Sequence, residues 1–347
     1  LGGGETEVYR QIRNAVPLLD AAIGKLVRLT GGFDVCCANP AAERALRQFL
    51  KSVNVGRGQV GIESFLAAFL QSMLVYGRAV GEMVVGGNEI AAVLWGDVTK
   101  LYVQEGDSPL DFAFGQWQGG EVKIFPRQHL ILFAAWNPDE ENPYGTSVFR
   151  SMPFLVDVLL KIYSTIGTNW ERAGNVRYSV VYKPGDASGQ IDAQERSEQI
   201  AEQWSQAMQE SRHGVVRDFV AVGDVQIKVI GADGQILDSE VPVRQILEQL
   251  VAKTGLPPFL LGLNWASTER MSAQQTDLLT SELWAIRRTV EPVLLRICRL
   301  WMQLHGYAEE PEIVWDEISL QDIVEQAHAA LYRAQAEKLT AEQEETT

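Results

Sequence analysis

The sequence has few cysteines, no long apolar run and a shortage of positive charge. Its cysteines are the adjacent pair Cys36 and Cys37 and the distant Cys298, a spacing that fits neither a disulfide framework nor a CxxC metal site. The longest nearly apolar run, residues 65–76, is interrupted by polar residues and is shorter than the roughly 20 residues that a bilayer span needs. We therefore expect a reducing compartment, no membrane segment and no metal centre.

Acidic residues outnumber basic ones, 45 to 30, which gives a formal net charge of −15. A protein that grips nucleic acid by neutralising phosphates has the opposite excess, so tight duplex binding is not expected. An acidic surface still allows DNA to move past without adhering. The chain of 347 residues, 46% of them hydrophobic, is long enough for more than one packed region.

The spacing of apolar residues predicts helices in the first part of the chain. One covers residues 5–29 with an interruption at Pro17, another follows Pro40, and a third covers residues 63–76. From Arg78 onwards the period changes to short apolar runs divided by GGN, GDSP and QGG turns. This pattern predicts a β-rich stretch.

The middle of the chain predicts a long helix followed by a small α/β unit. Apolar residues at helical spacing define the helix over residues 152–173. The unit after it comprises strands at 177–183, 217–222 and 225–230 and a helix at about 192–208.

The last third of the sequence predicts mainly helices. A helix that Gly255 closes is followed by the longest regular helix of the chain, for which Ser272 and Gln275 fit a capping box. Pro292 lies inside this helix and should bend it. A short acidic linker then leads to a last helix over about 320–339.

One motif suggests an enzyme. Gly56, Gly58 and Gly61 have the G-x-G-x-x-G spacing of a dinucleotide-binding loop, and Glu82 follows at a suitable distance. A nucleotide-dependent oxidoreductase is therefore the alternative function. The context opposes it, because a helical segment precedes the motif and no alternating βαβ pattern follows.

Other catalytic arrangements are missing from the sequence. It contains no GxxxxGK[ST] phosphate loop, and none of its four histidines has another His or Cys at metal-ligand spacing. Ser147 lacks the second glycine of a nucleophile elbow, and residues 139–141 are interpreted as a solvated acidic turn. We expect no enzymatic activity, no cofactor and no ATP hydrolysis by this chain.

The order of predicted elements, together with three local sequences, resembles the portal protein family of tailed bacteriophages. ESFLAAFLQSMLVYGRAVGEMVV resembles the family's helix that ends at a glycine before the first wing strand. NPYGTSVFRSMPFLVDVLLKIYSTIGTNWERAGNVRYSVVYKPG resembles its P-x-G-x-S segment, long helix and following strand. VRQILEQLVAKTGLPPFLLGLNWASTERMSAQQTDLLTSELWAIRRTVEPVLLRI resembles its helix, turn, polar loop and next helix. The resemblance covers roughly residues 5–305.

The resemblance implies an α+β, portal-like subunit with a mixed α/β wing, two stem helices, a small α/β clip, a kinked helix and a short helical crown. The corresponding segments are 1–144 for the wing, 145–174 for the first stem helix, 175–235 for the clip, 236–262 for the second stem helix and turn, 263–273 for the tunnel loop, 274–317 for the kinked wing helix and linker, and 318–347 for a reduced crown and tail.

The resemblance also implies which residues face the DNA channel. They form the tunnel loop: Leu263, Asn264, Trp265, Ala266, Ser267, Thr268, Glu269, Arg270, Met271 and Ser272. The helix that follows corresponds to the family's kinked helix, with the kink at Pro292.

The resemblance implies partners rather than substrates. About twelve copies would form a ring at one capsid vertex, contacting the major capsid or scaffold protein. The large terminase ATPase and then the head–tail connector would dock on it, and double-stranded DNA would pass through without sequence specificity. The protein would reside in the virion, and in the host cytoplasm during assembly.

Overall fold

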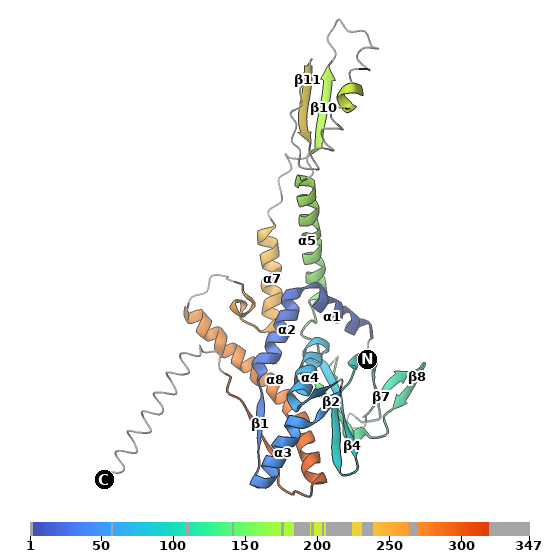
Figure 1. Cartoon of the computed structure of the whole chain (residues 1–347), viewed down its shortest axis with the longest axis vertical. Coiled ribbons are helices and arrows are strands. Elements are labelled where there is room, and N and C mark those ends of the chain that lie inside the picture. The colour runs from blue at the N-terminus through green and yellow to red at the C-terminus, as the bar shows by residue number, and fades with distance from the viewer. Residues whose placement is uncertain are drawn as a thin grey trace, which may run out of the picture. The chain divides into compact units, whose positions relative to one another are not determined.

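The computed structural model describes residues 3–56, 58–108, 112–140, 142–174, 177–183, 198–202, 224–230, 239–263 and 269–318, together with residues 195 and 205. The chain divides into two compact units. The first unit consists of Leu1–Asp157 together with Arg244–Thr347, and the second consists of Val158–Val243. Helices and strands are mixed in both (Figure 1). The α+β class predicted from the sequence is confirmed.

Four helices open the first unit. α1, Gly3–Ala15, and α2, Pro17–Thr30, are separated at the predicted proline, which takes the first helical position because its missing N–H would have no partner there. α3 is Pro40–Ser52, and the Asn39 side chain caps it by accepting hydrogen bonds from the amides of its first turn. α4, Ile62–Tyr76, is the most apolar of the described helices and has a broad buried face, so it forms the centre of this unit.

A five-stranded sheet packs on α4. Its strand order is β3-β2-β5-β4-β9, and every pairing is antiparallel except the short contact between β2 and β5. The strands are β2, Asn54–Gly56; β3, Gln59–Val60; β4, Arg78–Gly86; β5, Glu89–Trp95; and β9, Ile131–Ala135.

A three-stranded antiparallel sheet, β6-β7-β8, lies beside the first. A small apolar core joins the two sheets, with Val80 and Ile131 from the first packed against Leu101 and Phe114 from the second. The β-rich stretch predicted after Arg78 is therefore confirmed. The remaining elements are β6, Leu101–Glu105; β7, Phe112–Gln118; β8, Glu121–Ile124; and the 3-10 turns η1, Val98–Lys100, and η2, Gln128–Leu130.

The C-terminal part of the first unit returns to pack on its N-terminal helices. α7, Glu240–Thr254, ends at Gly255, which has a positive φ of 73° as predicted for a helix-closing glycine. After η3, Pro258–Leu261, the long helix α8 covers Glu269–Leu304 and buries the predicted apolar stripe between Leu279 and Ile297.

α8 differs from the sequence prediction at its start. It begins at Glu269, so Ser272 lies inside the first turn and the capping box predicted at Ser272 and Gln275 is wrong. A serine this far into a helix is past the position where its hydroxyl can cap free amides. Pro292 lies inside α8 as expected, and the bend there stays a prediction.

A two-stranded sheet connects the two ends of the first unit. β1, Phe33–Cys36, pairs antiparallel with β12, Glu312–Trp315. The acidic linker predicted after α8 is thus partly a strand. Each strand has only four residues, and the partners are far apart in the sequence, so no local pattern indicates the pairing.

The second unit is described in part. α5, Pro153–Gly174, begins in the first unit and continues into the second, where β10, Arg177–Lys183, pairs antiparallel with β11, Asp224–Ile230. The expected strand at 217–222 and the expected last helix at 320–339 lie outside the described residues. In the described part of the chain, no helix has the length and hydropathy needed to cross a membrane.

Candidate functional site

The glycine motif forms a hairpin rather than a phosphate-binding loop. Gly56 ends β2, Gly58 lies in the turn, and the next two residues form β3, which pairs back on β2. A dinucleotide loop runs from a parallel strand directly into a helix, with its backbone amides open to the pyrophosphate. Here the backbone between strand and helix is occupied by β pairing, so the motif does not present that surface.

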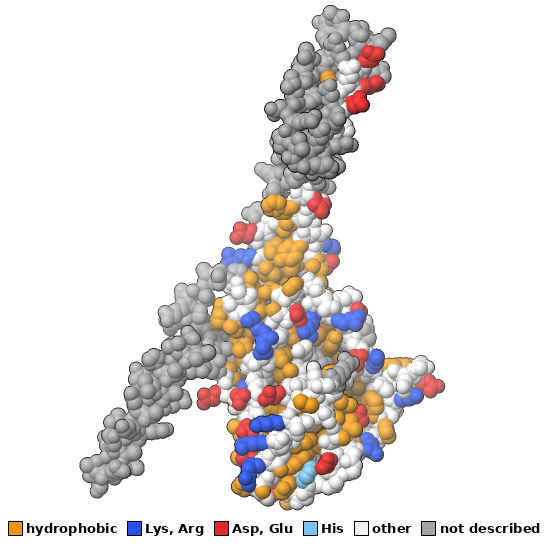
Figure 2. All heavy atoms as spheres, viewed as in Figure 1, with side chains coloured by type: hydrophobic (Ala, Val, Ile, Leu, Met, Phe, Trp, Pro, Cys, Tyr) orange, Lys and Arg blue, Asp and Glu red, His pale blue; other side chains and the backbone are white. Residues whose placement is uncertain are grey.

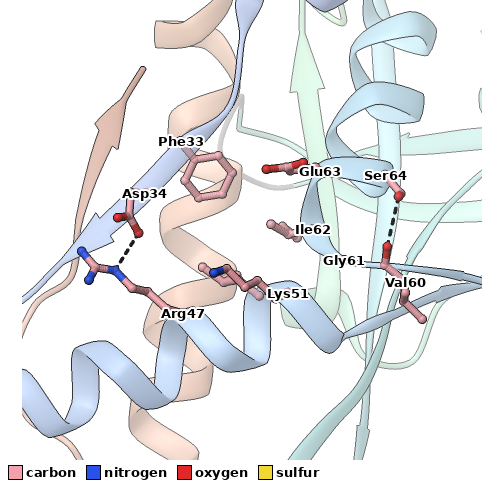
Figure 3. A pocket seen from close by; sticks show the side chains of 10 residues that line it. Phe33, Asp34, Arg47, Lys51, Val60, Gly61, Ile62, Glu63 and Ser64 are labelled. Atoms are coloured by element: carbon pink, nitrogen blue, oxygen red, sulfur yellow. Dashed lines mark hydrogen bonds and ion pairs between the residues drawn. The ribbon is translucent and has the colours of Figure 1, made fainter. Parts of the chain in front are cut away.

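A hollow of about 360 Å³ lies beside this hairpin, at the start of α4 (Figure 3). Phe33 and Ile62 point into it, and charged side chains surround them. Arg47 Nε donates to Asp34 Oδ1 at 2.7 Å, so the guanidinium that could meet a phosphate is already paired. The Glu63 carboxylate lies in the first turn of α4, where it would repel an anion.

Glu82, the acidic residue that completes the dinucleotide pattern, lines a different hollow. That hollow, of about 270 Å³, lies between the two sheets and contains Glu82, Asp97 and Lys100. In a dinucleotide fold the acid and the glycines share one ligand, with the acid on the ribose. The two halves of the motif therefore do not form one site in this structure.

The predicted tunnel loop is described only at its two ends. Leu263 follows η3, and Glu269, Arg270, Met271 and Ser272 form the first turn of α8. The central residues, Asn264, Trp265, Ala266, Ser267 and Thr268, lie outside the described residues. The loop is thus shorter than predicted at its C-terminal end, and its channel-facing role stays a prediction.

The P-x-G-x-S segment before α5 is anchored tightly to the end of α4. Gly77 O accepts a hydrogen bond from Trp136 N at 2.7 Å, and Ser147 Oγ donates to Val75 O at 2.6 Å. A Cβ on Gly145 would stand 1.9 Å from Gly77 O, so only glycine permits this crossing of two backbones. Ser147 is buried and hydrogen-bonded, which makes it a structural residue, as expected, rather than a nucleophile.

The apolar stripe predicted along α5 is covered at its start and uncovered further along. Leu159 is fully buried, whereas Ile162 and Ile166 are half-buried and Trp170 is 66% exposed. Tyr163, on the same side of the helix, is 46% exposed. Hydrophobic side chains gather on the surface over α5 (Figure 2). We call Tyr163, Ile166 and Trp170 the α5 face.

Solved structures share this fold, although no protein-family model and no curated protein sequence match the chain. A chain in the virion of a native gene transfer agent particle matches with a TM-score of 0.67 and 17% identity, over 97% of this chain and 89% of that chain. A chain in the neck of the native particle, computed with C12 symmetry, matches with a TM-score of 0.66 and 17% identity, over 94% and 88%. The chain has the fold of these particle chains.

An HK97 family phage portal protein from Corynebacterium diphtheriae also matches, with a TM-score of 0.48 and 9% identity, over 88% of this chain and 94% of that chain. The α+β fold predicted from the sequence is confirmed by the likeness to the two particle chains. A shared fold does not by itself assign an activity.

Proposed function

We propose that the chain is the subunit of a portal-type ring, a channel for double-stranded DNA at one vertex of a phage-like head. The observation that carries this proposal is the likeness to chains of gene transfer agent virions and necks over 94–97% of the chain. A match of that extent includes every part that the sequence assigns to wing, stem and clip. A single domain that occurs in many unrelated proteins would match only part of the chain, so it does not explain this likeness.

The α5 face supports the ring. An apolar stripe that continues along a helix beyond its own covering needs another surface to bury it. Tyr163 and Trp170 are large aromatic residues, which are enriched where subunits meet. In a ring, the neighbouring copy would supply the missing cover.

The net negative charge of the chain is better suited to a channel that DNA passes through than to a surface that binds DNA tightly. Twelve copies at −15 each would carry about −180, and carboxylates along such a channel would repel phosphates and keep DNA mobile. The segment 263–268, between η3 and α8, is the part that we assign to the channel wall. Its contacts with DNA would be weak and independent of base sequence.

The partners follow from the same assignment. The clip, residues 175–235, would contact the large terminase ATPase during packaging and the head–tail connector afterwards, and the wing would contact the major capsid or scaffold protein. The ring would assemble in the host cytoplasm and remain in the virion. The oxidoreductase alternative is not retained, because the glycine motif is a hairpin and Glu82 lines another hollow.

The experiment is to measure the mass of the purified protein by light scattering and to image it by negative stain. The unaltered protein should form large rings. The double variant Tyr163→Glu and Trp170→Glu should shift towards the 38.5 kDa monomer. Each substitution removes an aromatic side chain whose burial between subunits would contribute about 1.5–3 kcal/mol.

Ser164→Glu is the matched control. Ser164 is exposed and points about 100° away from Tyr163 around α5, and it also receives a glutamate, so its rings should persist. An unaltered protein that stays a sharp monomer across salt and protein concentrations would remove the ring proposal. Rings of normal mass in the double variant would instead show that the α5 face is not an interface.

A further inference from the structure

The pairing of β1 with β12 is too small to hold the end of the first unit by itself. Each strand has four residues, and an isolated two-stranded ribbon is marginally stable in water. Val314 and Glu312 of β12 are exposed, so burial of alternate β12 side chains contributes little. Another interaction must fix the chain after α8 to the N-terminal part.

That interaction centres on a buried cation. Arg287 of α8 is 1% exposed, and its guanidinium carbon lies 5.1 Å from the ring centres of both Trp284 and Trp315. Its Nε donates to the carbonyl of Thr30, at the end of α2, at 2.8 Å. The side chain of one helix residue thus contacts the end of α2 and the last residue of β12.

The guanidinium has no second hydrogen-bonded partner among the described residues. Both terminal nitrogens of Arg287 are buried without one, and burial lowers its pKa, while the nearby Asp316 carboxylate opposes that shift. An arginine is rarely buried in this way, because desolvating a charge is costly unless other groups stabilise it. Two indole faces and one carboxylate provide that stabilisation here.

The backbone around the cation is shaped to fit it. Asp316 and Gly32 exchange two hydrogen bonds, each of 3.1 Å, one through the Asp316 carboxylate and one between backbones. A Cβ on Gly31 would come within 3.0 Å of an Arg287 terminal nitrogen, and one on Gly32 within 2.8 Å of the Asp316 carboxylate. Trp315 Nε1 also donates to Glu291 on α8 at 2.9 Å.

We infer that Arg287, Trp315 and Asp316 form a latch that fastens the strand after α8 onto the glycine pair between α2 and β1. The latch, more than the β pairing, sets the path of the chain from Leu304 to Ile318. It should open as a local unit, because its contacts all lie at this end of the first unit and none involves the five-stranded sheet. The inference does not depend on the ring.

The test is hydrogen exchange of Arg287→Met, with Arg288→Met as the control. Methionine keeps most of the side-chain volume and removes the charge, and Arg288 is the exposed neighbour on the same helix. Amides of β1 and β12 should exchange at least about tenfold faster in Arg287→Met. Amides of β4 and β9 should keep their rates, and Arg288→Met should match the unaltered protein.

A second variant covers the case in which Arg287→Met does not fold. Trp315→Leu removes one aromatic face of the latch from the β12 side only, and it should produce the same local acceleration. Unchanged exchange in β1 and β12 would overturn the latch. So would equal acceleration throughout the first unit, because Arg287 would then be a general core residue.

Discussion

Substitution of Gly77 tests whether the close backbone contact at the end of α4 holds the P-x-G-x-S segment in place. The residue ends α4 in the left-handed conformation, with φ of 78°. A Cβ there would lie 2.5 to 2.7 Å from three backbone atoms of Thr146 and Ser147. Backbone atoms cannot rotate away as the end of a side chain can, so Gly77→Ala should push the segment off α4.

Gly58 is the matched control, because it has the same φ of 78° and, apart from its chain neighbours, no atom of the described residues lies within 4 Å of its would-be Cβ. Gly58→Ala therefore measures the left-handed strain alone, about 1–2 kcal/mol, partly offset by the lower entropy of the unfolded chain. Gly77→Ala adds an overpacking cost of about 1–3 kcal/mol. We therefore expect Gly77→Ala to lower the free energy of unfolding by about 1–3 kcal/mol more than Gly58→Ala does.

Thermal unfolding at one protein concentration measures the difference. One kcal/mol corresponds to a melting temperature shift of about 2–4 °C in a domain of 150–250 residues, so Gly77→Ala should melt several degrees below Gly58→Ala. Concentration must be fixed because an oligomer's apparent stability depends on it. Equal melting temperatures for the two variants would refute the reasoning, since strain would then be the whole effect.

Two further predictions concern single segments. Cys36 is exposed and Cys298 is buried, and burial raises the pKa of the Cys298 thiol to about 12. A thiol reagent at pH 8 should therefore label Cys36 in the native protein and Cys298 only after denaturation; native labelling of both at similar rates would contradict the packing of α8. Replacing residues 265–268 with a Gly-Ser linker should leave rings intact by microscopy and reduce the fraction of DNA-filled heads, whereas normal filling would remove the tunnel-loop assignment.

The sequence alone determined most of the helices and the β-rich stretch, because these depend on local periodicity and on breaking residues. The break at Pro17 and the closing of α7 at Gly255 were predicted from residue type, and the end of α4 at Tyr76 was predicted from the helical period. The sequence also predicted the portal-type fold, since several moderately specific segments occur in one order. It also predicted a tunnel loop between a turn and a long helix, and it placed the start of that helix at residue 274, whereas α8 begins at Glu269.

The tertiary structure alone decided which distant residues meet. The four residues of β12 carry no local sequence pattern that predicts pairing with β1. The hydrogen-bonded residues Gly32 and Asp316 are 284 positions apart in the chain. The sequence could not show that Arg287 is buried while Trp170 is exposed, because burial depends on what other elements cover each helix face. Likewise, G-x-G-x-x-G spacing is compatible with both a phosphate loop and a hairpin. In the hairpin seen here, β3, which lies inside the motif, pairs with one edge of β2, and β5, which is remote from the motif in the chain, pairs with the other edge.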